Sequence, residues 1–253
     1  MFEPNECCGD PTRFSQAQSD QLNTRSTVIL DAMASTGLSA NEDMQALLQD
    51  GFVYVQDPVS GHRVDEMERN AIPFASHRGF EFFKVNVLDQ PRIRDVLDSS
   101  FEWYGLGLYR SFGAVPGDYS FRQSDPGSDI ESLLIQFWKE GSKITFWRES
   151  HKKHLPTTKG ENNLWRVPRI ALQNRGLVPV EVTFERGGYS IRDTRVIVAV
   201  SEGSAITFEM ATREVMKKWW TPMKLPKSLQ KMVQSMEAPN FGMNVTYLED
   251  EET

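Results

Sequence analysis

From Gly107 onward the chain is a succession of short apolar segments separated by turn signals, and this pattern limits the fold more than any other feature. Seven segments have the length and the β-branched or aromatic content of strands: residues 107–112, 133–138, 144–147, 180–184, 189–193, 196–200 and 205–210. Pro-Gly, Glu-Gly and Gly-Gly pairs fall between several of them. Many short strands in succession predict an antiparallel sandwich or barrel.

Helical patterns precede and flank these strands. An apolar stripe or a capping signal predicts helices at about residues 39–49, 64–71, 91–97, 168–175, 212–219 and 228–236, with a shorter one after Thr27. One further strand is expected at residues 52–55, closed by Asp57 and Pro58. The fold class expected is therefore mainly β with flanking helices (α+β).

The length of 253 residues corresponds to one large domain or two small ones. Residues 1–25 are rich in Asn, Gln, Ser and Asp without periodicity, and we expect a flexible N-terminal arm there. Residues 26–236 are expected to form one domain with its helices at the periphery. Residues 237–253 end in the acidic run LEDEET and are expected to be a tail.

The charge balance and the absence of long apolar runs narrow the classes of partner. The chain has 28 basic and 35 acidic side chains, a net charge of −7, so a nucleic-acid partner is not expected. No apolar run approaches the roughly 18 residues of a membrane span. The first residues lack the order of a signal peptide, and we expect a cytoplasmic protein without a membrane span.

Few side chains are available for metal or nucleophile chemistry. The two cysteines, Cys7 and Cys8, are adjacent in the N-terminal arm and are expected to be free thiols. Of the four histidines, His62 and His77 lie in segments expected to be a turn and a loop. The motifs of zinc proteases, serine hydrolases, P-loop enzymes and dinucleotide-binding folds are absent from the sequence.

The other two histidines follow a predicted strand. His151 and His154 are three residues apart, and with Glu149 they offer a possible set of three metal ligands. Lys152 and Lys153 lie between them and oppose a divalent cation. A solvated loop explains the segment equally well.

The segment from Phe184 to Arg195 is the second candidate for chemistry. Strand alternation places Asp193 and Arg195 on one face, together with Tyr189 and Ile191. On an inward face this carboxylate and guanidinium would orient or polarise a polar substrate. The alternative is a structural Asp–Arg pair at the end of a strand.

Aromatic side chains are dense around the predicted strands. The group comprises Trp103, Tyr104, Tyr109, Phe112, Phe137, Trp138, Phe146 and Trp147. Aromatic residues in strands are usually core, but a barrel lined with them also forms an apolar pocket.

Three segments together resemble the phytanoyl-CoA-dioxygenase-like branch of the Fe(II)/2-oxoglutarate oxygenase superfamily. They are residues 48–60 (LQDGFVYVQDPVS), residues 141–152 (GSKITFWRESHK) and residues 187–195 (GGYSIRDTR), in the order that the family shows. The resemblance implies a double-stranded β-helix, or jelly roll, with helices around it. Several uncharacterised fungal proteins share the pattern, which suggests a divergent fungal branch.

The iron-binding residues of that family do not carry over to this chain. The family holds iron with a His-x-Asp/Glu pair and a distant His, and an Arg anchors 2-oxoglutarate. The pair should precede the strand at residues 133–138, yet residues 104–131 contain no histidine. The distal His should follow Asp193, where the sequence reads Thr-Arg-Val-Ile-Val, and the Arg position near residues 205–210 is unfilled. The resemblance therefore implies the fold with the iron motif lost.

These observations favour a metal-independent biosynthetic enzyme in fungal secondary metabolism that needs no cofactor. We expect a cyclase or isomerase, including the pericyclase type, acting on an apolar small-molecule intermediate. The residues expected to be catalytic are His151, Asp193, Arg195 and Tyr109. The residues expected to bind substrate are Trp138, Trp147, Phe112, Tyr189 and Gln136.

Two alternatives belong to other classes of function. The first is a non-haem Fe(II)/2-oxoglutarate oxygenase with non-standard ligands, drawn from His151, His154 and Asp193, or His62. The second is a non-catalytic small-molecule binding protein. The expected partner in all cases is an apolar small molecule, and a homodimer is left open.

Overall fold

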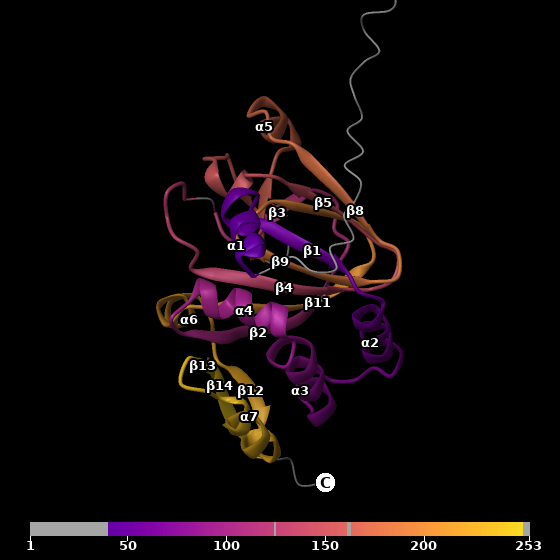
Figure 1. The fold of residues 1–253 in the computed structure, drawn as a ribbon, viewed down its shortest axis with the longest axis vertical. Helices are drawn as coiled ribbons and strands as arrows, with labels where there is room; N and C mark the ends of the chain where they lie inside the picture. The colour runs from indigo at the N-terminus through magenta and orange to yellow at the C-terminus, as the bar shows by residue number, and fades with distance from the viewer. Residues whose placement is uncertain (1–39, 124, 161–162, 250–253) are drawn as a thin grey trace, which may run out of the picture. The chain divides into compact units, whose positions relative to one another are not determined.

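Two six-stranded sheets, antiparallel except for the last strand of the first sheet, form the centre of the protein (Figure 1). The computed structural model describes residues 40–123, 125–160 and 163–249. The first sheet has the order β1 (Phe52–Gln56), β9 (Gly188–Asp193), β4 (Ser132–Trp138), β11 (Ser204–Ala211), β2 (Tyr104–Gly113) and β13 (Phe241–Met243). The second has the order β6 (Thr158–Lys159), β7 (Trp165–Val167), β3 (Asp118–Ser120), β10 (Val198–Glu202), β5 (Ser142–Trp147) and β8 (Pro179–Phe184).

The strand order is that of a jelly roll. The run β9-β4-β11-β2 in the first sheet faces the run β3-β10-β5-β8 in the second. Within each run, every strand is antiparallel to its neighbours. Along the chain, β2, β3, β4 and β5 alternate between the two sheets, as do β8, β9, β10 and β11. This arrangement confirms the expected fold class, which is mainly β with flanking helices.

The helices lie around the sheets, and α1 and α4 cover the outer face of the first one (Figure 1). Their bounds are α1 (Ala40–Gln49), α2 (Pro58–Arg69), α3 (His77–Phe83), α4 (Pro91–Ser100), α5 (Arg169–Asn174), α6 (Arg213–Trp219) and α7 (Gln230–Met236). A π-helical turn, Lys84–Leu88, follows α3. The Asp57 carboxylate caps α2 and the Thr212 hydroxyl caps α6, so both helices begin where their N-terminal amides find an acceptor.

Each strand of the first sheet has two different faces. In β4, Ile135 and Phe137 belong to the large core that the helices cover. Trp138 points the other way, into the core between the two sheets, where its ring stacks on Phe184 at 5.7 Å between ring centroids. We call these the outer face and the inner face of the first sheet. Their alternation follows from the two-residue period of a strand.

All seven strands predicted from residue 107 onward are present, with ends shifted by a few residues. Several short elements were missed. The strands β3, β6 and β7 have two or three residues each, too few for a periodic pattern. His77 was expected in a loop and instead begins α3, because the Ser76 side chain caps that helix. His62 lies within α2 and is exposed.

The prediction of a tail from residue 237 is wrong for its first part. In that segment β13 pairs with β2, and β14 (Val245–Leu248) pairs with β12 (Met223–Pro226). Phe241 is buried against Tyr104, with 5.5 Å between ring centroids, and this apolar contact holds the segment on the sheet.

The predicted N-terminal arm, its short helix and the two cysteines lie outside the described residues. Within the described part of the chain, no helix is both long enough and apolar enough to cross a membrane. The cytoplasmic location stays a prediction.

Candidate functional site

A cavity of about 630 Å³ lies at one end of the jelly roll, between β2 and β11 of the first sheet and β6 and β7 of the second. We call it the barrel pocket. Its lining residues are Leu108, Arg110, Phe112, Phe121, Arg122, Gln123, Asp125, Lys159, Asn163, Leu164, Trp165, Glu209, Trp219 and Trp220. Its volume is in the range of about 300–1,000 Å³ that is common for small-molecule sites.

Glu209 is the most deeply buried lining residue that can titrate. It lies on the inner face of β11 between Phe208 and Met210, which point to the helices, and its side chain is only 1% exposed. Burial raises the pKa of this carboxyl to about 7, although the Trp220 indole and the nearby Arg122 and Arg192 lower it in part. A carboxyl with a pKa near neutrality can both accept and release a proton.

Two polar atoms facing this cavity lack regular hydrogen-bond partners among the described residues. They are Glu209 Oε2 and Trp220 Nε1. The indole N–H is a donor only, and the carboxyl oxygen accepts when ionised and donates when protonated. The two groups are nevertheless near each other, since the Trp220 indole and the Ser132 hydroxyl lower the pKa of Glu209. Buried polar groups normally make well-formed hydrogen bonds, so a polar ligand atom at this point of the pocket would complete the bonding of both groups.

A polar network backs the pocket on the inner face. Arg192 is fully buried, and its Nε donates to Gln136 Oε1 at 2.7 Å while Nη1 donates to the Val196 carbonyl at 3.0 Å. Gln136 Nε2 in turn donates to Thr207 Oγ1 at 3.1 Å. Burial lowers the pKa of Arg192 to about 9, which leaves its guanidinium protonated at neutral pH.

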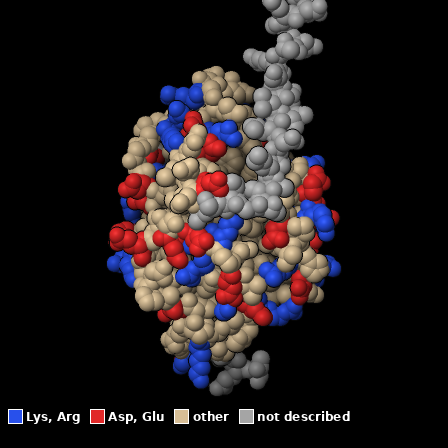
Figure 2. Space-filling view, in the orientation of Figure 1, with Lys and Arg blue, Asp and Glu red and all other residues tan. Residues whose placement is uncertain are grey.

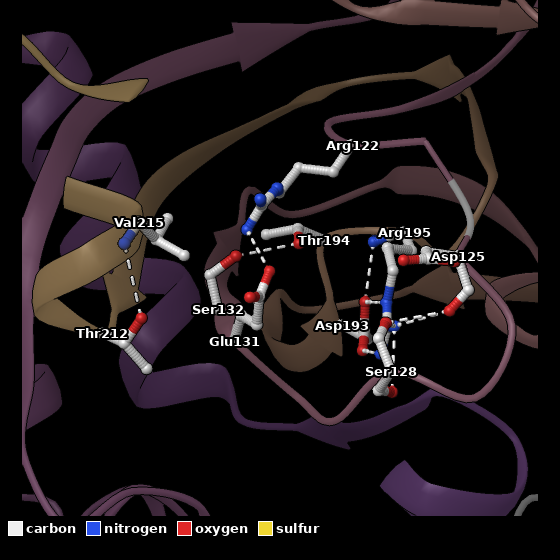
Figure 3. A network of polar contacts seen from close by, with 10 residues as sticks. All are labelled: Arg122, Asp125, Ser128, Glu131, Ser132, Asp193, Thr194, Arg195, Thr212 and Val215. Atoms are coloured by element: carbon white, nitrogen blue, oxygen red, sulfur yellow. Dashed lines mark hydrogen bonds and ion pairs between the residues drawn. The ribbon is translucent and has the colours of Figure 1, made fainter. Parts of the chain in front are cut away.

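One wall of the pocket is held by a buried ion pair (Figure 3). Arg195 binds the Asp193 carboxylate through Nη2 at 2.6 Å and Nε at 2.9 Å. Its Nη1 reaches the carbonyls of Asp125 and Ser128, at 3.3 and 3.1 Å, and the Ser128 hydroxyl. The pair therefore fixes the loop that carries Asp125 to the pocket.

A second pair in the same view fixes Arg122 (Figure 3). Its Nη1 lies 3.2 Å from Glu131 Oε2, and its guanidinium carbon lies 5.5 Å from the ring centroid of Trp219. Next to Glu131, the hydroxyls of Ser132 and Thr194 bond at 2.9 Å. Arg122 is thus positioned between α6 and the start of β4.

The expectation that Asp193 points inward is corrected by the strand register, and Arg195 lies beyond the end of β9 and so has no place in the alternation. Across β9, β4 and β11, Asp193 pairs with Leu133 and then with Met210, and Leu133 and Met210 belong to the outer core. The inner face carries Arg192 instead. The two faces of β9 are both fully buried, so burial gave no sign of which one faces the second sheet.

The histidines proposed as metal ligands are not brought together. His151 is buried. Its imidazole and the Val196 side chain pack so closely on Gly51 that a Cβ there would clash with both. Burial lowers the pKa of His151, although Asp193 opposes this, and His151 Nδ1 has no hydrogen-bond partner among the described residues. His154 is exposed. The described residues contain no group of three His, Cys, Asp or Glu that could hold a metal ion.

The two tyrosines of the predicted site lie on the outer face. Tyr109 packs on Phe208, with 4.4 Å between ring centroids, and its hydroxyl donates to the Gly79 carbonyl at 2.8 Å. Tyr189 packs on Phe137 at 5.8 Å. Neither residue lines the barrel pocket. Burial raises the pKa of Tyr189 to about 12 and that of Tyr109 still further.

The predicted substrate-binding residues divide between the core and the pocket. Trp138 is buried between the sheets and donates to Ser190 Oγ at 2.8 Å, and Trp147 donates to Asp118 Oδ1 at 2.7 Å. Phe112 lines the pocket, and Gln136 lies in the polar network behind it. Of the predicted substrate-binding residues, Phe112 lines the pocket, whereas Gln136 and the two tryptophans do not.

The residues at the family's iron position do not fit an iron site. The resemblance in the sequence would place the ligands in the segment before β4 and in the segment after Asp193, before β10. The first carries Arg122, Gln123 and Asp125, the second carries Thr194 and Arg195, and neither contains a histidine. The interior beside them holds the buried Arg192 guanidinium. Iron of this class needs imidazole and carboxylate ligands, and guanidinium groups repel a divalent cation.

A second cavity, also about 630 Å³, shares only Trp220 with the barrel pocket. It lies against α6 and the segment that contains β13, with Trp103, Arg213 and Phe241 among its lining residues. Its carboxyl group, Glu237, is not buried, and no unpaired buried carboxyl faces it. The barrel pocket is therefore the stronger candidate within the described part of the chain.

Comparisons with known proteins give no evidence beyond that of the strand order. No family model matches the chain, and no curated protein matches it. Among solved structures, an "epimerase SnoN in complex with Fe3+, alpha ketoglutarate and nogalamycin RO" is similar at 14% identity and a TM-score of 0.49, covering 68% of this chain and 83% of that one. HygX from Streptomyces hygroscopicus with iron bound is similar at 13% identity and a TM-score of 0.48, covering 75% of this chain and 91% of that one. Similarity at this level carries no argument about function.

The sequence analysis missed Glu209, Trp220 and Arg122. A usable pattern did exist for Glu209, since it is a lone acidic residue in the apolar strand Ala205–Ala211. Charged residues are rarely buried without a partner, so a charge within such a strand marks a candidate site. Trp220 and Arg122 follow a helix and a very short strand, and only the packing of those segments brings them to Glu209.

Proposed function

We propose that this protein is a metal-independent enzyme that moves a proton on an apolar small molecule, as an isomerase or a cyclase. Glu209 is the acid–base residue in this proposal, and the barrel pocket is the substrate site. The observation that carries the proposal is a buried carboxyl, with its pKa raised to about 7, in a pocket that five aromatic side chains help to line. Acid–base groups are most effective when their pKa is near the working pH.

Glu209 and Trp220 carry out the proposed proton transfer. Ionised Glu209 takes a proton from a carbon next to a carbonyl group, and the electrons of that C–H bond move into the enolate. The Trp220 indole N–H donates a hydrogen bond to the enolate oxygen, and Arg122 adds positive charge nearby. Protonated Glu209 then returns the proton at another carbon, which isomerises the substrate, or protonates the product of ring closure.

The rest of the lining excludes water and holds the substrate. Phe112, Phe121 and Trp165 present aromatic faces, and the Arg195–Asp193 pair keeps the loop at Asp125 in place. Positioning of this kind removes much of the entropic barrier to an intramolecular reaction. In this proposal Phe112 contacts the substrate, as predicted, whereas Gln136, which was also predicted to bind substrate, holds the Arg192 guanidinium.

Solvent deuterium exchange tests the proposal directly. The protein is incubated in D₂O with a panel of apolar cyclic ketones, among them 2-tetralone and β,γ-unsaturated decalones, and the uptake of deuterium is followed by mass spectrometry. We expect exchange by the native protein and a loss of about 100-fold or more in Glu209→Gln. Glu202→Gln serves as the matched control, because Glu202 is an exposed carboxyl paired with Lys143.

Four results would contradict the proposal. Exchange in none of the ketones, or exchange that survives Glu209→Gln, removes Glu209 as the acid–base residue. Exchange or oxidation that disappears in excess EDTA and returns with Fe(II) favours the oxygenase alternative. Ligand binding without any turnover favours the non-catalytic alternative.

A further inference from the structure

Cationic side chains surround the opening of the barrel pocket, and each lies over an aromatic ring. The distances from cation to ring centroid are 4.7 Å for Arg110 on Phe112, 4.3 Å for Lys159 on Trp165, and 5.5 Å for Arg122 on Trp219. A cation held over an aromatic face stays ordered without a carboxylate. The rim therefore presents fixed positive charge above an apolar interior.

Two of these cations have no carboxylate partner among the described residues. Arg122 is paired with Glu131, but Lys159 bonds only to the carbonyl of Asn163, at 2.7 Å. Arg110 contacts Phe112 and has no ion pair in the described part of the chain. Some other exposed cations are paired, as Lys143 is with Glu202 and Lys84 with Asp89, and these serve as a comparison.

This local charge is opposite to that of the chain as a whole. The net charge is −7, and Figure 2 shows acidic and basic side chains interspersed over the viewed face. The lining of the barrel pocket has three cations against two carboxyls, Asp125 and Glu209. Glu209 is partly neutral near pH 7, because burial raises its pKa. The opening is thus a positive site on an acidic protein.

The cations and Glu209 lie at different depths. Arg110 and Lys159 are exposed at the rim, whereas Glu209 is buried at the floor. In the strand register, Arg110 lies beside Thr207, two residues from Glu209 along β11. A ligand that touches both ends must carry its charged group away from its reacting group.

We infer that the substrate is a carboxylic acid with an apolar, fused-ring or polyene body, whose carboxylate lies at the rim between Arg110 and Lys159. The inference rests on the proposed function, since it names the substrate class of the same site. The body fills the aromatic interior, and its far end reaches Glu209 and Trp220. The cations act on binding and on substrate selection rather than on the proton transfer.

Matched ligands that differ only in charge test this inference. Binding of 2-naphthoate and of the neutral 2-naphthamide is measured by calorimetry at low salt, with the full-length native protein. We expect the carboxylate to bind roughly tenfold tighter, a difference of about 1.4 kcal/mol, and to lose that preference as salt rises. The double variant Arg110→Gln/Lys159→Gln should bind both ligands about equally. The control Lys143→Gln/Lys84→Gln removes two exposed cations that are paired elsewhere and should keep the preference.

The outcomes separate the inference from the proposed function. Equal binding of the two ligands by the native protein, no binding of either, or a preference that survives the double variant each overturns the inference. None of these results changes the deuterium exchange expected from Glu209. Conversely, a carboxylate preference that persists in Glu209→Gln, together with exchange that Glu209 does not affect, keeps the inference and removes the proposed function.

Discussion

The two faces of the first sheet are equally buried but chemically opposite. On the outer face, one register row across β9, β4, β11 and β2 reads Ile191, Ile135, Phe208 and Tyr109. The adjacent row lies one residue away in each strand and therefore on the inner face. It reads Arg192, Leu134, Glu209 and Leu108. The first row is apolar apart from one phenol. The second contains two charged groups that water does not reach.

This difference separates the part of the sheet that holds the fold from the part that we propose to be functional. Burial of apolar side chains stabilises the protein, whereas burial of a charged group costs free energy unless it is paired. Arg192 is satisfied by Gln136 and a carbonyl, but one oxygen of Glu209 has no regular partner in the described part of the chain. A cost that folding does not recover is typical of functional sites.

The largest expected effect comes from the outer face. Phe208 contacts the rings of Phe82, Phe83, Tyr109 and Phe137, and it is fully buried. Phe208→Ala should lower the free energy of unfolding by about 4 kcal/mol, because it leaves a large cavity in the core. Urea denaturation measures this, and a loss below about 1 kcal/mol would show that the outer face does not carry the stability.

The Asp193–Arg195 pair is the next test, because it joins β9 to the pocket wall. Asp193→Asn leaves a mostly buried guanidinium without its carboxylate, and we expect a loss of about 3 kcal/mol in the free energy of unfolding. Hydrogen exchange should become faster in residues 125–131, which Arg195 holds in place. Lys143→Gln breaks an exposed pair and should cost less than about 1 kcal/mol. Similar losses in the two variants would contradict a special role for the buried pair.

Glu209 should make the pH dependence of the native protein differ from that of Glu209→Gln. Its pKa is raised in the folded state to about 7 from an ordinary value of 4.5, so the folded protein binds this proton more tightly than the unfolded chain. Its contribution to stability is therefore complete below pH 4.5 and is lost as the pH rises through 7. Above pH 7, Glu209→Gln should be more stable than the native protein by up to about 3 kcal/mol.

Denaturation curves at several pH values measure that difference. At pH 4.5 and below, the native protein and Glu209→Gln should have nearly equal free energies of unfolding. The variant Glu202→Gln should follow the native protein throughout, because Glu202 is exposed. A native protein more stable than Glu209→Gln at pH 8 would mean that the carboxylate is well paired in the folded state.

The smallest expected effect compares near-isosteric changes on the two faces of β11. Thr207→Val removes the oxygen that accepts from Gln136, and it should cost about 1–2 kcal/mol because a buried amide loses its partner. Ile206→Val on the outer face removes one methylene group and should cost about 1 kcal/mol. We expect only the first change to alter the deuterium exchange rate. An effect of Ile206→Val on that rate would contradict the assignment of the proposed activity to the inner face alone.

Much of the fold could be predicted because strands have a short period. The segments that became β2, β4, β5, β8, β9, β10 and β11 each have enough β-branched or aromatic residues to be recognised alone. The short strands and the parallel pairs at residues 223–226 and 241–248 depend on partners far along the chain. No local pattern encodes such pairings.

The candidate site was less accessible from the sequence. Phe112 was expected to bind substrate and lines the pocket, whereas Gln136, expected with it, does not line the pocket and bonds to Arg192 and Thr207. Tyr109 and Tyr189 were expected with them, but alternation places these two residues on the helix-covered face. A shift of one residue moves every side chain of a strand to the other face of the sheet.

By itself, the sequence determined where the longer strands lie, that their side chains alternate, and that neither residues 104–131 nor the residues just after Asp193 contain a histidine. Only the tertiary structure decided which set of alternating residues faces the second sheet, and so placed Arg192 and Glu209 inside and Asp193 outside. The physical reason is that both faces of these strands are buried, one by helices and one by the other sheet. Local hydrophobicity then distinguishes strand from loop, but not one buried face from the other.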